Sequence, residues 1–545
     1  MRPDRDSVTH NAAGPRPEQG ILKSAGVISA AVAASRMTGL VRESVLGWLF
    51  GAGATFDAFV LGYRIPNLAR DLFAEGALAS AFVPTFTRYL ATRTREEARE
   101  LSNVTATLLV AITGTLCALG MIFSPAFVEL FASGFRAVPG KFELATQLVR
   151  IMFPFLTLIA LAAQAQGILN ANHQFGIPAL SSSLFNIGSI VCGLTLGYWI
   201  GPRFGITPVY GMAFGILFGG LAQLLFQLPS VWRAGFMWRP AWNLRHQGVR
   251  DILKLMGPAI LSGASVQINV LVNTNLAASL RDATGHVMNG PVSWLSYAFR
   301  FQQLPLGLFG ISIASATLPR IARSAAHGNY VEFRETLSRS IVMILLTTIP
   351  ASVGLAVVGE SMIGIVYQHG RFSSFDTHQT AIALSCYAIG LAGYASVKLL
   401  SPAFYALGDA RTPMIVSMAS IVVNAVTAFT TVRVLGFGHA GLALSLSIVA
   451  LFNSLVLLTL MRRRIGGVRA REMGISLAKI ILAAALMGAV CYGLVRISPS
   501  RALNVIAGIP LGALVFYATA SALRIPELAE VKATVLRKLS RGPRI

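Results

Sequence analysis

Apolar runs of 18 or more residues recur along nearly the whole of this 545-residue chain. Such runs are long enough to cross the hydrocarbon core of a bilayer as helices. The composition, 54% hydrophobic and 12% charged residues with a mean hydropathy of +0.65, is too apolar for the surface of a soluble protein. We therefore predict an all-α polytopic membrane protein of about 14 transmembrane helices. The spans are expected at 26–50, 55–90 (long and broken), 102–132, 143–170, 176–201, 208–232, 251–280, 289–319, 335–358, 377–407, 412–435, 439–461, 474–496 and 502–523.

The basic residues fall mostly in alternate connections between these runs. The arginine-rich connections are 88–99, 233–250, 320–339 and 462–471, whereas the others hold one or two basic residues each, such as Arg203 and Arg371. By the positive-inside rule the rich set is cytoplasmic, which explains the net charge of +23 better than nucleic-acid binding does. Residues 1–22 are polar, lack the features of a signal peptide and are expected to form a disordered cytoplasmic tail. An even number of spans places the basic tail 526–545 on the same side.

Two halves of the chain resemble each other at a nearly constant offset. The stretch GILNANHQFGIPAL (167–180) is similar to AFYALGDARTPMIV (403–416), and AFVPTFTRYLA (81–91) is similar to ATLPRIARSAA (316–326). Repeats in the same orientation predict two parallel six-helix lobes, 23–240 and 241–470, as in transporters that rock around a central cavity. Two C-terminal helices within 471–525 fall outside the repeat. Gly211, Gly215 and Gly219 form a double GxxxG pattern, which predicts close helix packing.

The sequence offers no pattern typical of an enzyme or a cofactor protein. The four cysteines, Cys117, Cys192, Cys386 and Cys491, lie singly in apolar segments and are expected to be packing residues. The histidines lack metal-site spacing, and no Walker-type loop or GxSxG elbow is present. We expect a transporter without a cofactor, a metal or ATP, driven by the membrane potential or an ion gradient.

Four arginines, Arg36, Arg42, Arg70 and Arg300, lie inside or beside strongly apolar stretches. A charge at the bilayer centre costs about 2.5–3.5 kcal/mol on insertion scales, so several such charges are expected to face a water-filled cavity. Guanidinium groups bind phosphate oxygens in bidentate fashion, which predicts an anionic cargo. Two alternatives remain open: structural ion pairs such as Arg42–Asp57 or Arg70–Glu75, and, for Arg300, an interfacial anchor with Trp294 and Tyr297.

Polar and acidic residues accompany these arginines. Glu43 lies seven residues after Arg36 and shares its helix face, and Asp57 begins the second span. Arg64, Asn67, Asp71 and Glu75 recur every three or four residues and form one polar stripe. We predict that Glu43, Asp57, Asn67 and Glu75 belong to the cavity, where they hold the arginines in position or exchange partners with them. Arg64 and Asp71 could be structural or functional.

The block SRMTGLVRES…FGAGATFDAFVLGYRIPNLARDLFAEGALASAFVP (35–84) resembles the lipid II flippases of the MurJ (MviN) family. GPAILSGASVQIN (257–269) and VSWLSYAFR (292–300) resemble the seventh and eighth helices of that family. The resemblance implies the multidrug/oligosaccharidyl-lipid/polysaccharide exporter superfamily, with two lobes, two extra helices that form a lipid groove, and alternating access. It also places the family's cavity arginines at Arg36, Arg42, Arg70 and Arg300, and its cavity carboxylates at Asp57 and Glu75. Phe299 stands where some members have an acidic residue, and no acidic residue lies within 255–280 to form the sodium site described for some members.

The resulting expectation is a flippase of the bacterial inner membrane, not an enzyme, with both termini cytoplasmic. Its cargo is expected to be lipid II, the undecaprenyl-diphosphate-linked disaccharide-pentapeptide of peptidoglycan biosynthesis, and its partners the bilayer and the proteins of cell-wall synthesis. Alternatives are a flippase for another polyprenyl-diphosphate-linked glycan, a drug/cation antiporter, and a scaffold for envelope assembly. The arginine excess argues against a cationic cargo.

Overall fold

The computed structural model describes residues 17–72 and 78–528, and they are almost entirely helical. Outside the helices, the described residues contain one isolated β-bridge, between Arg281 and Val287. The chain divides into two compact units. Unit 1 comprises the described residues of Met1–Arg42, Phe73–Cys117 and Pro154–Met256, and unit 2 those of Glu43–Leu72, Ala118–Phe153 and Gly257–Ile545. Three of the boundaries fall inside helices, namely α1 (Pro17–Phe50), α4 (Arg95–Ile122) and α10 (Gln247–Ala278), which contribute to both units.

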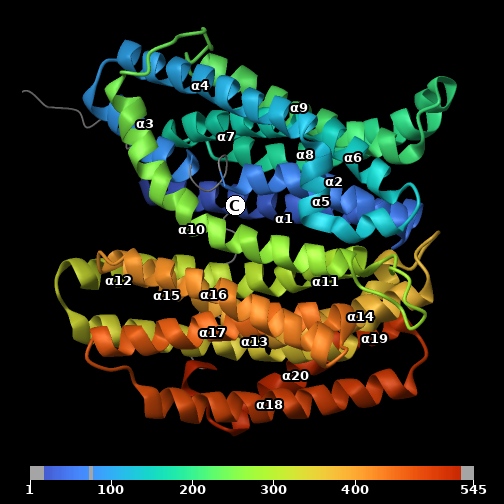
Figure 1. Cartoon of the computed structure of the whole chain (residues 1–545). Helices are drawn as coiled ribbons and strands as arrows, with labels where there is room; N and C mark the ends of the chain where they lie inside the picture. Colours follow the sequence, from blue (N-terminus) through green and yellow to red (C-terminus); the bar gives the residue numbers. More distant parts are fainter. Residues whose placement is uncertain (1–16, 73–77, 529–545) are drawn as a thin grey trace, which may run out of the picture. The chain divides into compact units, whose positions relative to one another are not determined.

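Unit 1 is built around a close pair of helices. Besides its parts of α1, α4 and α10, it contains α3 (Ala79–Thr92), α7 (Phe155–Ala171), α8 (Gly176–Leu194), η3 (Thr195–Ile200), η4 (Gly201–Phe204) and α9 (Pro208–Arg233). α8 and α9 lie side by side (Figure 1). A Cβ atom at Gly219 would lie 2.5 Å from the carbonyl oxygen of Phe185, and one at Gly215 would overlap the carbonyl oxygen of Ser189. The predicted GxxxG packing is therefore confirmed, because only glycine allows this approach.

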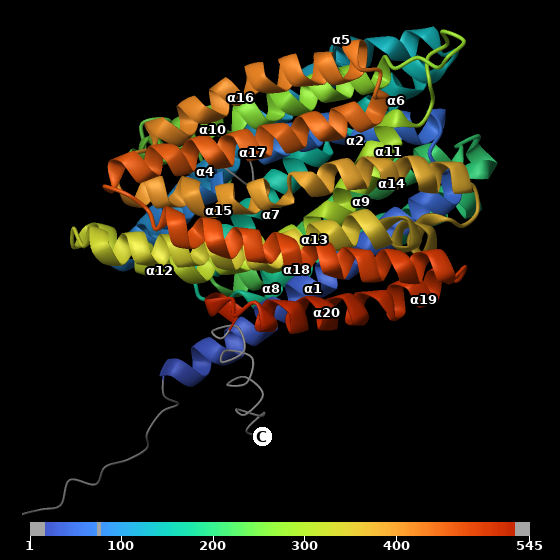
Figure 2. The same ribbon diagram turned by 90° about the horizontal axis from the view of Figure 1, so that it is seen from below.

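Unit 2 contains the remaining helices. In chain order they are α2 (Ala54–Arg70), α5 (Ser124–Ala132), η2 (Ser133–Ala137), α6 (Lys141–Met152), α11 (Pro291–Pro305), η5 (Leu306–Ile311), α12 (Ser312–Ala326), α13 (Tyr330–Tyr367), α14 (Ser374–Ile389), α15 (Leu391–Ala406), α16 (Arg411–Phe429), η6 (Thr430–Val434), α17 (Gly438–Arg464), α18 (Ala470–Ile497), α19 (Arg501–Ile506) and α20 (Gly508–Ala522). α18 and α20 run along α13 (Figure 2) and share a buried core with it that includes Val342, Ile480 and Phe516. The two helices predicted outside the repeat thus pack onto a helix of the second half.

Ten helices or helix pairs of the described part are long and apolar enough to cross a membrane, and a bent pair, α14 with α15, would make an eleventh. Each of the predicted spans coincides with one helix or with two or three consecutive helices, and the span 55–90 also includes residues outside the described part. The number 14 itself stays a prediction. α2 has only 17 residues, and the segment between α2 and α3 includes residues outside the described part. The proposed lobe boundaries likewise stay a prediction, as do the tails 1–22 and 526–545, most of which lie outside the described residues.

Candidate functional site

Two of the predicted arginines lie on the part of α1 that belongs to unit 1. The Arg42 side chain is buried, with its guanidinium carbon 5.2 Å from the centre of the Phe185 ring on α8. The next residue, Asn186, donates from Nδ2 to the carbonyl oxygen of Ser35 and to Oγ1 of Thr38, both at 3.2 Å. These contacts fix α1 against α8 on both sides of Arg36. Arg36 is exposed, whereas Arg42 rests on an aromatic face, as cation–π packing favours.

A second group of arginines lies within unit 2. Arg300 on α11 has Nη2 3.2 Å from Oε1 of Glu43, and 41% of its side chain is exposed. Arg64 on α2 donates to Oγ1 of Thr274 on α10 at 2.8 Å, and Arg70 at the end of α2 lies 2.9 Å from Oδ1 of Asp71. Arg300 also interacts electrostatically with Arg64 and Arg70. Among the residues that the structure describes, the three arginines of this group are accompanied by two carboxylates, Glu43 and Asp71.

Asp71 links two of the predicted polar residues of α2. It accepts hydrogen bonds from Nε of Arg70 at 3.2 Å and from Nδ2 of Asn67 at 3.4 Å. Arg64 and Asp71 thus take part in the arginine group, although sequence reasoning left their role open. Their spacing of three and four residues from the other polar residues of the stripe had indicated that they share one helix face. Glu75 lies outside the described residues, so its predicted pairing with Arg70 is not tested.

Asp57 forms a closed ion pair at the start of α2. Its Oδ2 lies 2.8 Å from Nζ of Lys141 at the start of α6, and both side chains are 1% exposed. Asp57 also accepts from the backbone nitrogens of Gly290 and Ser293 at 2.8 and 2.9 Å and from Oγ of Ser293. A carboxylate with all its acceptor sites filled holds helices together. The sequence analysis missed Lys141, although a lysine just before an apolar span was a detectable signal. The predicted role of Asp57 toward the arginines stays a prediction.

The aromatic neighbours of Arg300 are buried in the protein. Trp294 is 1% exposed and donates from Nε1 to Oδ1 of Asp376 at 2.9 Å. Tyr297 is fully buried and donates to the carbonyl oxygen of Gly51 at 3.3 Å. Aromatic anchors lie at the membrane–water interface, with one end apolar and the other wet. The interfacial-anchor alternative for Arg300 is therefore wrong for these two partners.

The remaining polar features do not assemble a metal centre. Within residues 17–72 and 78–528, no three His, Cys, Asp or Glu side chains are grouped as metal ligands would be. The α10 segment contributes uncharged amides: Asn273 Oδ1 accepts from Asn424 Nδ2 at 2.9 Å, and Asn424 Oδ1 accepts from Ser445 Oγ at 3.2 Å. This network joins α10, α16 and α17 through neutral groups.

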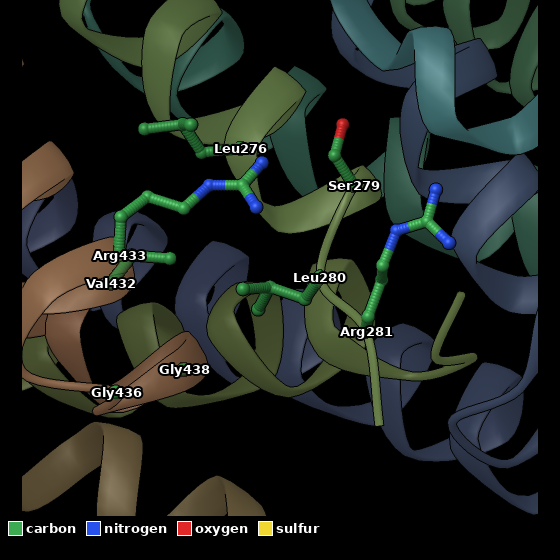
Figure 3. A pocket seen from close by; sticks show the side chains of 8 residues that line it. All are labelled: Leu276, Ser279, Leu280, Arg281, Val432, Arg433, Gly436 and Gly438. Atoms are coloured by element: carbon green, nitrogen blue, oxygen red, sulfur yellow. The ribbon is translucent and has the colours of Figure 1, made fainter. Parts of the chain in front are cut away.

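A pocket of about 200 Å³ opens elsewhere in unit 2, at the ends of α10 and η6 (Figure 3). Arg281 and Arg433 are its charged residues, and the Arg433 guanidinium extends toward Leu276 and Ser279. None of the predicted site residues lines it. Arg281 is itself held by the carbonyl oxygen of Gly285 at 2.6 Å.

Known proteins give a consistent comparison. Residues 47–506 match the family described as "Lipid II flippase MurJ". The "Probable lipid II flippase MurJ" of Vibrio cholerae serotype O1 is 36% identical over 449 residues, which cover 80% of this chain and 82% of the relative. A structure titled "Lipid II flippase MurJ, inward closed conformation" superposes with a TM-score of 0.75 at 27% identity, covering 91% of this chain and 98% of that one. An inward-facing multidrug resistance MATE transporter shares the fold, with a TM-score of 0.66 at 18% identity over 79% of this chain and 94% of its own. The helical fold, the arginines in the spans and the match over most of the length agree, and the chain belongs to the lipid II flippase MurJ family.

Proposed function

We propose that this protein moves lipid II from the cytoplasmic to the periplasmic leaflet of the bacterial inner membrane by alternating access. Membership of the MurJ family supports the cargo and the process. Within the molecule, the observation that carries the proposal is the group of Arg64, Arg70 and Arg300, three guanidinium groups of α2 and α11 that interact electrostatically. Each charge costs several kcal/mol in a bilayer, which favours a binding role for a group of arginines.

The arrangement of Arg300 explains how an anion could be exchanged. Glu43 compensates the Arg300 charge at 3.2 Å, and 41% of the Arg300 side chain is exposed. A diphosphate carries more charge and more acceptor oxygens than one carboxylate, and it fits the planar fork of arginine. It can therefore displace Glu43 and engage Arg70 as well. Neutralising the diphosphate lowers the cost of carrying it through a region of low dielectric constant.

No bond is made or broken in this process, so the drive has to come from outside the chain. We propose that the membrane potential supplies it, at about 2.3 kcal/mol per elementary charge per 100 mV. After release of the anionic headgroup, the positive site is drawn back toward the negative cytoplasmic side. An ion gradient is the alternative source, and no cofactor is required.

The orientation of the chain follows from its charges. We propose that both termini and the arginine-rich connections are cytoplasmic, in accordance with the positive-inside rule. The undecaprenyl tail would stay in lipid beside α18 and α20, whose outer faces expose Ile481, Leu482 and Leu514. Proteins of cell-wall synthesis would receive the product in the periplasm.

Two other cargoes fit less well. Another polyprenyl-diphosphate-linked glycan would meet the same arginines and would differ only in sugar contacts. A cationic drug would be repelled by the net charge of the Arg64, Arg70 and Arg300 group, although the MATE fold is shared. That likeness is one of fold alone.

Complementation of a strain depleted of its own lipid II flippase tests the proposal. Wild type is expected to restore growth, whereas Arg70→Ala and Arg300→Ala are expected to fail at equal membrane levels. Arg36→Ala and Arg42→Ala test the two arginines of unit 1 in the same way. Arg203→Ala, in the exposed η4 turn, is the matched control and should restore growth. Failure of wild type would point to a different glycan-lipid cargo, and full rescue by the arginine variants would show that they are structural.

A further inference from the structure

The connection between α9 and α10, residues 234–246, is held along α4 by a regular row of polar side chains. The row consists of α4 residues spaced four apart, which lie on one face of a helix. Arg95 Nη2 and Arg99 Nε donate to the carbonyl oxygens of Ala234 and Gly235 at 2.7 and 2.8 Å, Asn103 Oδ1 accepts from Arg239 N at 3.1 Å, and Thr107 Oγ1 accepts from Ala241 N at 3.1 Å and from Trp238 Nε1 at 3.3 Å. At 1.5 Å per residue the row is about 18 Å long. The connection is therefore docked on α4 from Ala234 to Ala241.

The docked connection turns one apolar side chain inward and four outward. Phe236 is 4% exposed and packs edge-on against Phe86 of α3, with the ring centres 5.2 Å apart. The outward side chains are Met237, Trp238, Trp242 and Leu244, each about half exposed or more. Gly235, with φ of +85°, makes the turn out of α9 that a side chain would strain. The outward face would be unfavourable in water, and no described residue of unit 1 covers it.

The sequence of α4 indicates at which membrane depth this face lies. The helix begins with the polar stretch REEARELSN and becomes apolar from Val104 onward. The hydrogen bonds at Asn103 and Thr107 therefore place Trp238 and its neighbours where the span passes from headgroups into hydrocarbon. Tryptophan is enriched at this level in membrane proteins, because its ring is apolar and its N–H is polar.

Positive charge surrounds the same face. Arg233, Arg239, Arg245 and Arg250 are exposed, and no Asp or Glu occurs between residues 233 and 250. Within the described residues no carboxylate pairs with any of these four side chains. Exposed aromatic residues interleaved with arginines are the combination that binds an anionic lipid surface, through apolar insertion and attraction to headgroup phosphates.

We propose that residues 233–250 form a membrane-interface anchor that binds anionic phospholipid headgroups of the cytoplasmic leaflet, with Arg239 and Arg245 on the phosphates and Trp238 and Trp242 in the headgroup layer. The choice of leaflet rests on the orientation in the proposed function, whereas the lipid binding does not. The anchor lies between the last helix of the first predicted lobe and the first helix of the second. Anionic lipid would thus hold this connection at a fixed depth while the helices on either side move.

Native mass spectrometry of the full-length protein tests the anchor directly. Protein purified in detergent is titrated with phosphatidylglycerol or with zwitterionic phosphatidylcholine, and the bound lipids are counted. Arg239→Gln/Arg245→Gln is expected to weaken phosphatidylglycerol binding about tenfold or more and to leave phosphatidylcholine binding unchanged, since a basic residue near an anionic surface contributes on the order of 1 kcal/mol. Trp238→Ser/Trp242→Ser is expected to weaken the binding of both lipids. Unchanged phosphatidylglycerol binding by both variants would overturn the proposal.

Two controls separate the anchor from other effects. Arg320→Gln/Arg323→Gln removes the same charge from exposed positions of α12, which contains no tryptophan, and it should bind phosphatidylglycerol like wild type. An equal loss with this pair would reduce the effect to net charge and reject the anchor.

Sidedness is tested with Pro240→Cys in a background without Cys117, Cys192, Cys386 and Cys491, using an impermeant maleimide on intact cells and on inverted vesicles. Labelling from outside intact cells would contradict the proposed orientation while leaving the lipid-binding result standing.

Discussion

At the scale of single residues, two ion pairs of unit 2 show how burial separates a binding group from a structural one. Arg300 and Glu43 are 3.2 Å apart, with 41% of the arginine side chain exposed. Asp57 and Lys141 are 2.8 Å apart, with 1% of each side chain exposed. A guanidinium with part of its surface exposed is accessible to another anion. A buried pair is not accessible in this way, and separating it leaves an uncompensated charge.

Substitutions at Arg300 should distinguish charge from geometry. We expect Arg300→Ala to lower the initial rate of lipid II transport in proteoliposomes about 10- to 100-fold, which corresponds to about 1.5–3 kcal/mol for a hydrogen bond to a charged group. Arg300→Lys should recover part of the rate, because lysine keeps the charge but loses the bidentate fork. Glu43→Gln should lower the rate less than Arg300→Ala does. A wild-type rate for Arg300→Ala would remove Arg300 from the transport path.

Substitutions at Asp57 and Lys141 should affect stability. We expect Asp57→Asn or Lys141→Met alone to cost about 3–5 kcal/mol, because each leaves its partner charged and buried. The double variant should cost clearly less than the sum of the two, since the uncompensated charge is gone. Thermal unfolding in detergent measures all three. Additive single effects would show that the two side chains are not coupled.

The arginines of the site could be predicted from the sequence, but the side chains that pair with charged residues could not. Arg36, Arg42, Arg70 and Arg300 stand out because apolar neighbours make any charge conspicuous. Lys141, in contrast, lies 84 residues from Asp57, and their pairing depends on the packing of α6 against α2. The periodicity of residues within a single helix cannot indicate which residue of another helix will be the partner. The roles of the predicted site residues as a set remain predictions.

At the scale of elements, the internal repeat reappears as one turn used twice. α7 ends in a turn with His173 at φ of +59°, and α15 ends in a turn with Gly408 at φ of +73°. In the first turn Gln174 N donates to Leu169 O at 2.8 Å, and in the second Asp409 N donates to Phe404 O at 3.0 Å. These residues keep the offset of 235 found between Pro178 and Pro413. The similarity of the two sequence stretches thus reflects one backbone structure.

Three glycine-to-alanine changes should have three different outcomes. Gly219→Ala should destabilise unit 1, because the new methyl group would meet Ser189 and Phe185 of α8. Gly408→Ala has open space around it but requires a left-handed backbone, which should cost about 1–2 kcal/mol. Gly114→Ala, within α4 and without a neighbour within 4 Å, should stabilise by about 0.5–1 kcal/mol. Unfolding midpoints compare the three, and a stabilising Gly219→Ala would contradict the close α8–α9 contact.

Helix breaks were harder to predict than helices. The predicted span 377–407 is two helices, α14 and α15, bent by 43°, and the predicted span 289–319 passes through the π-helical turn η5 after Pro305. An apolar run of about 20 residues signals a span through its mean hydropathy. Averaging over that length conceals a bend of a few residues. The break predicted in 55–90 from Pro66 and Gly76 stays a prediction, because residues 73–77 lie outside the described part.

At the scale of the whole molecule, the compact units and the sequence repeats describe different things. The repeats are continuous along the sequence, whereas each compact unit combines separate segments, and α1, α4 and α10 pass from one unit into the other. Each of these three helices begins in one unit and continues into the other. A boundary of this kind arises from packing between distant segments, so a linear pattern of hydropathy and charge could not have indicated it.

The last prediction concerns how the whole molecule responds to a membrane potential. If the empty carrier returns because its positive charge moves toward a negative cytoplasm, imposing a potential of that sign on proteoliposomes should accelerate repeated turnover. The effect is at most about 50-fold per 100 mV for one charge that crosses the full potential, from about 2.3 kcal/mol. Arg300→Gln should flatten this voltage dependence in addition to slowing transport, whereas Arg203→Gln should leave it unchanged. The potential is set with a potassium gradient and valinomycin at equal pH on both sides, so that a proton gradient does not contribute. A turnover that ignores the potential but follows a sodium or proton gradient would replace electrical return with ion coupling, and the net charge of the arginine group would then serve binding alone.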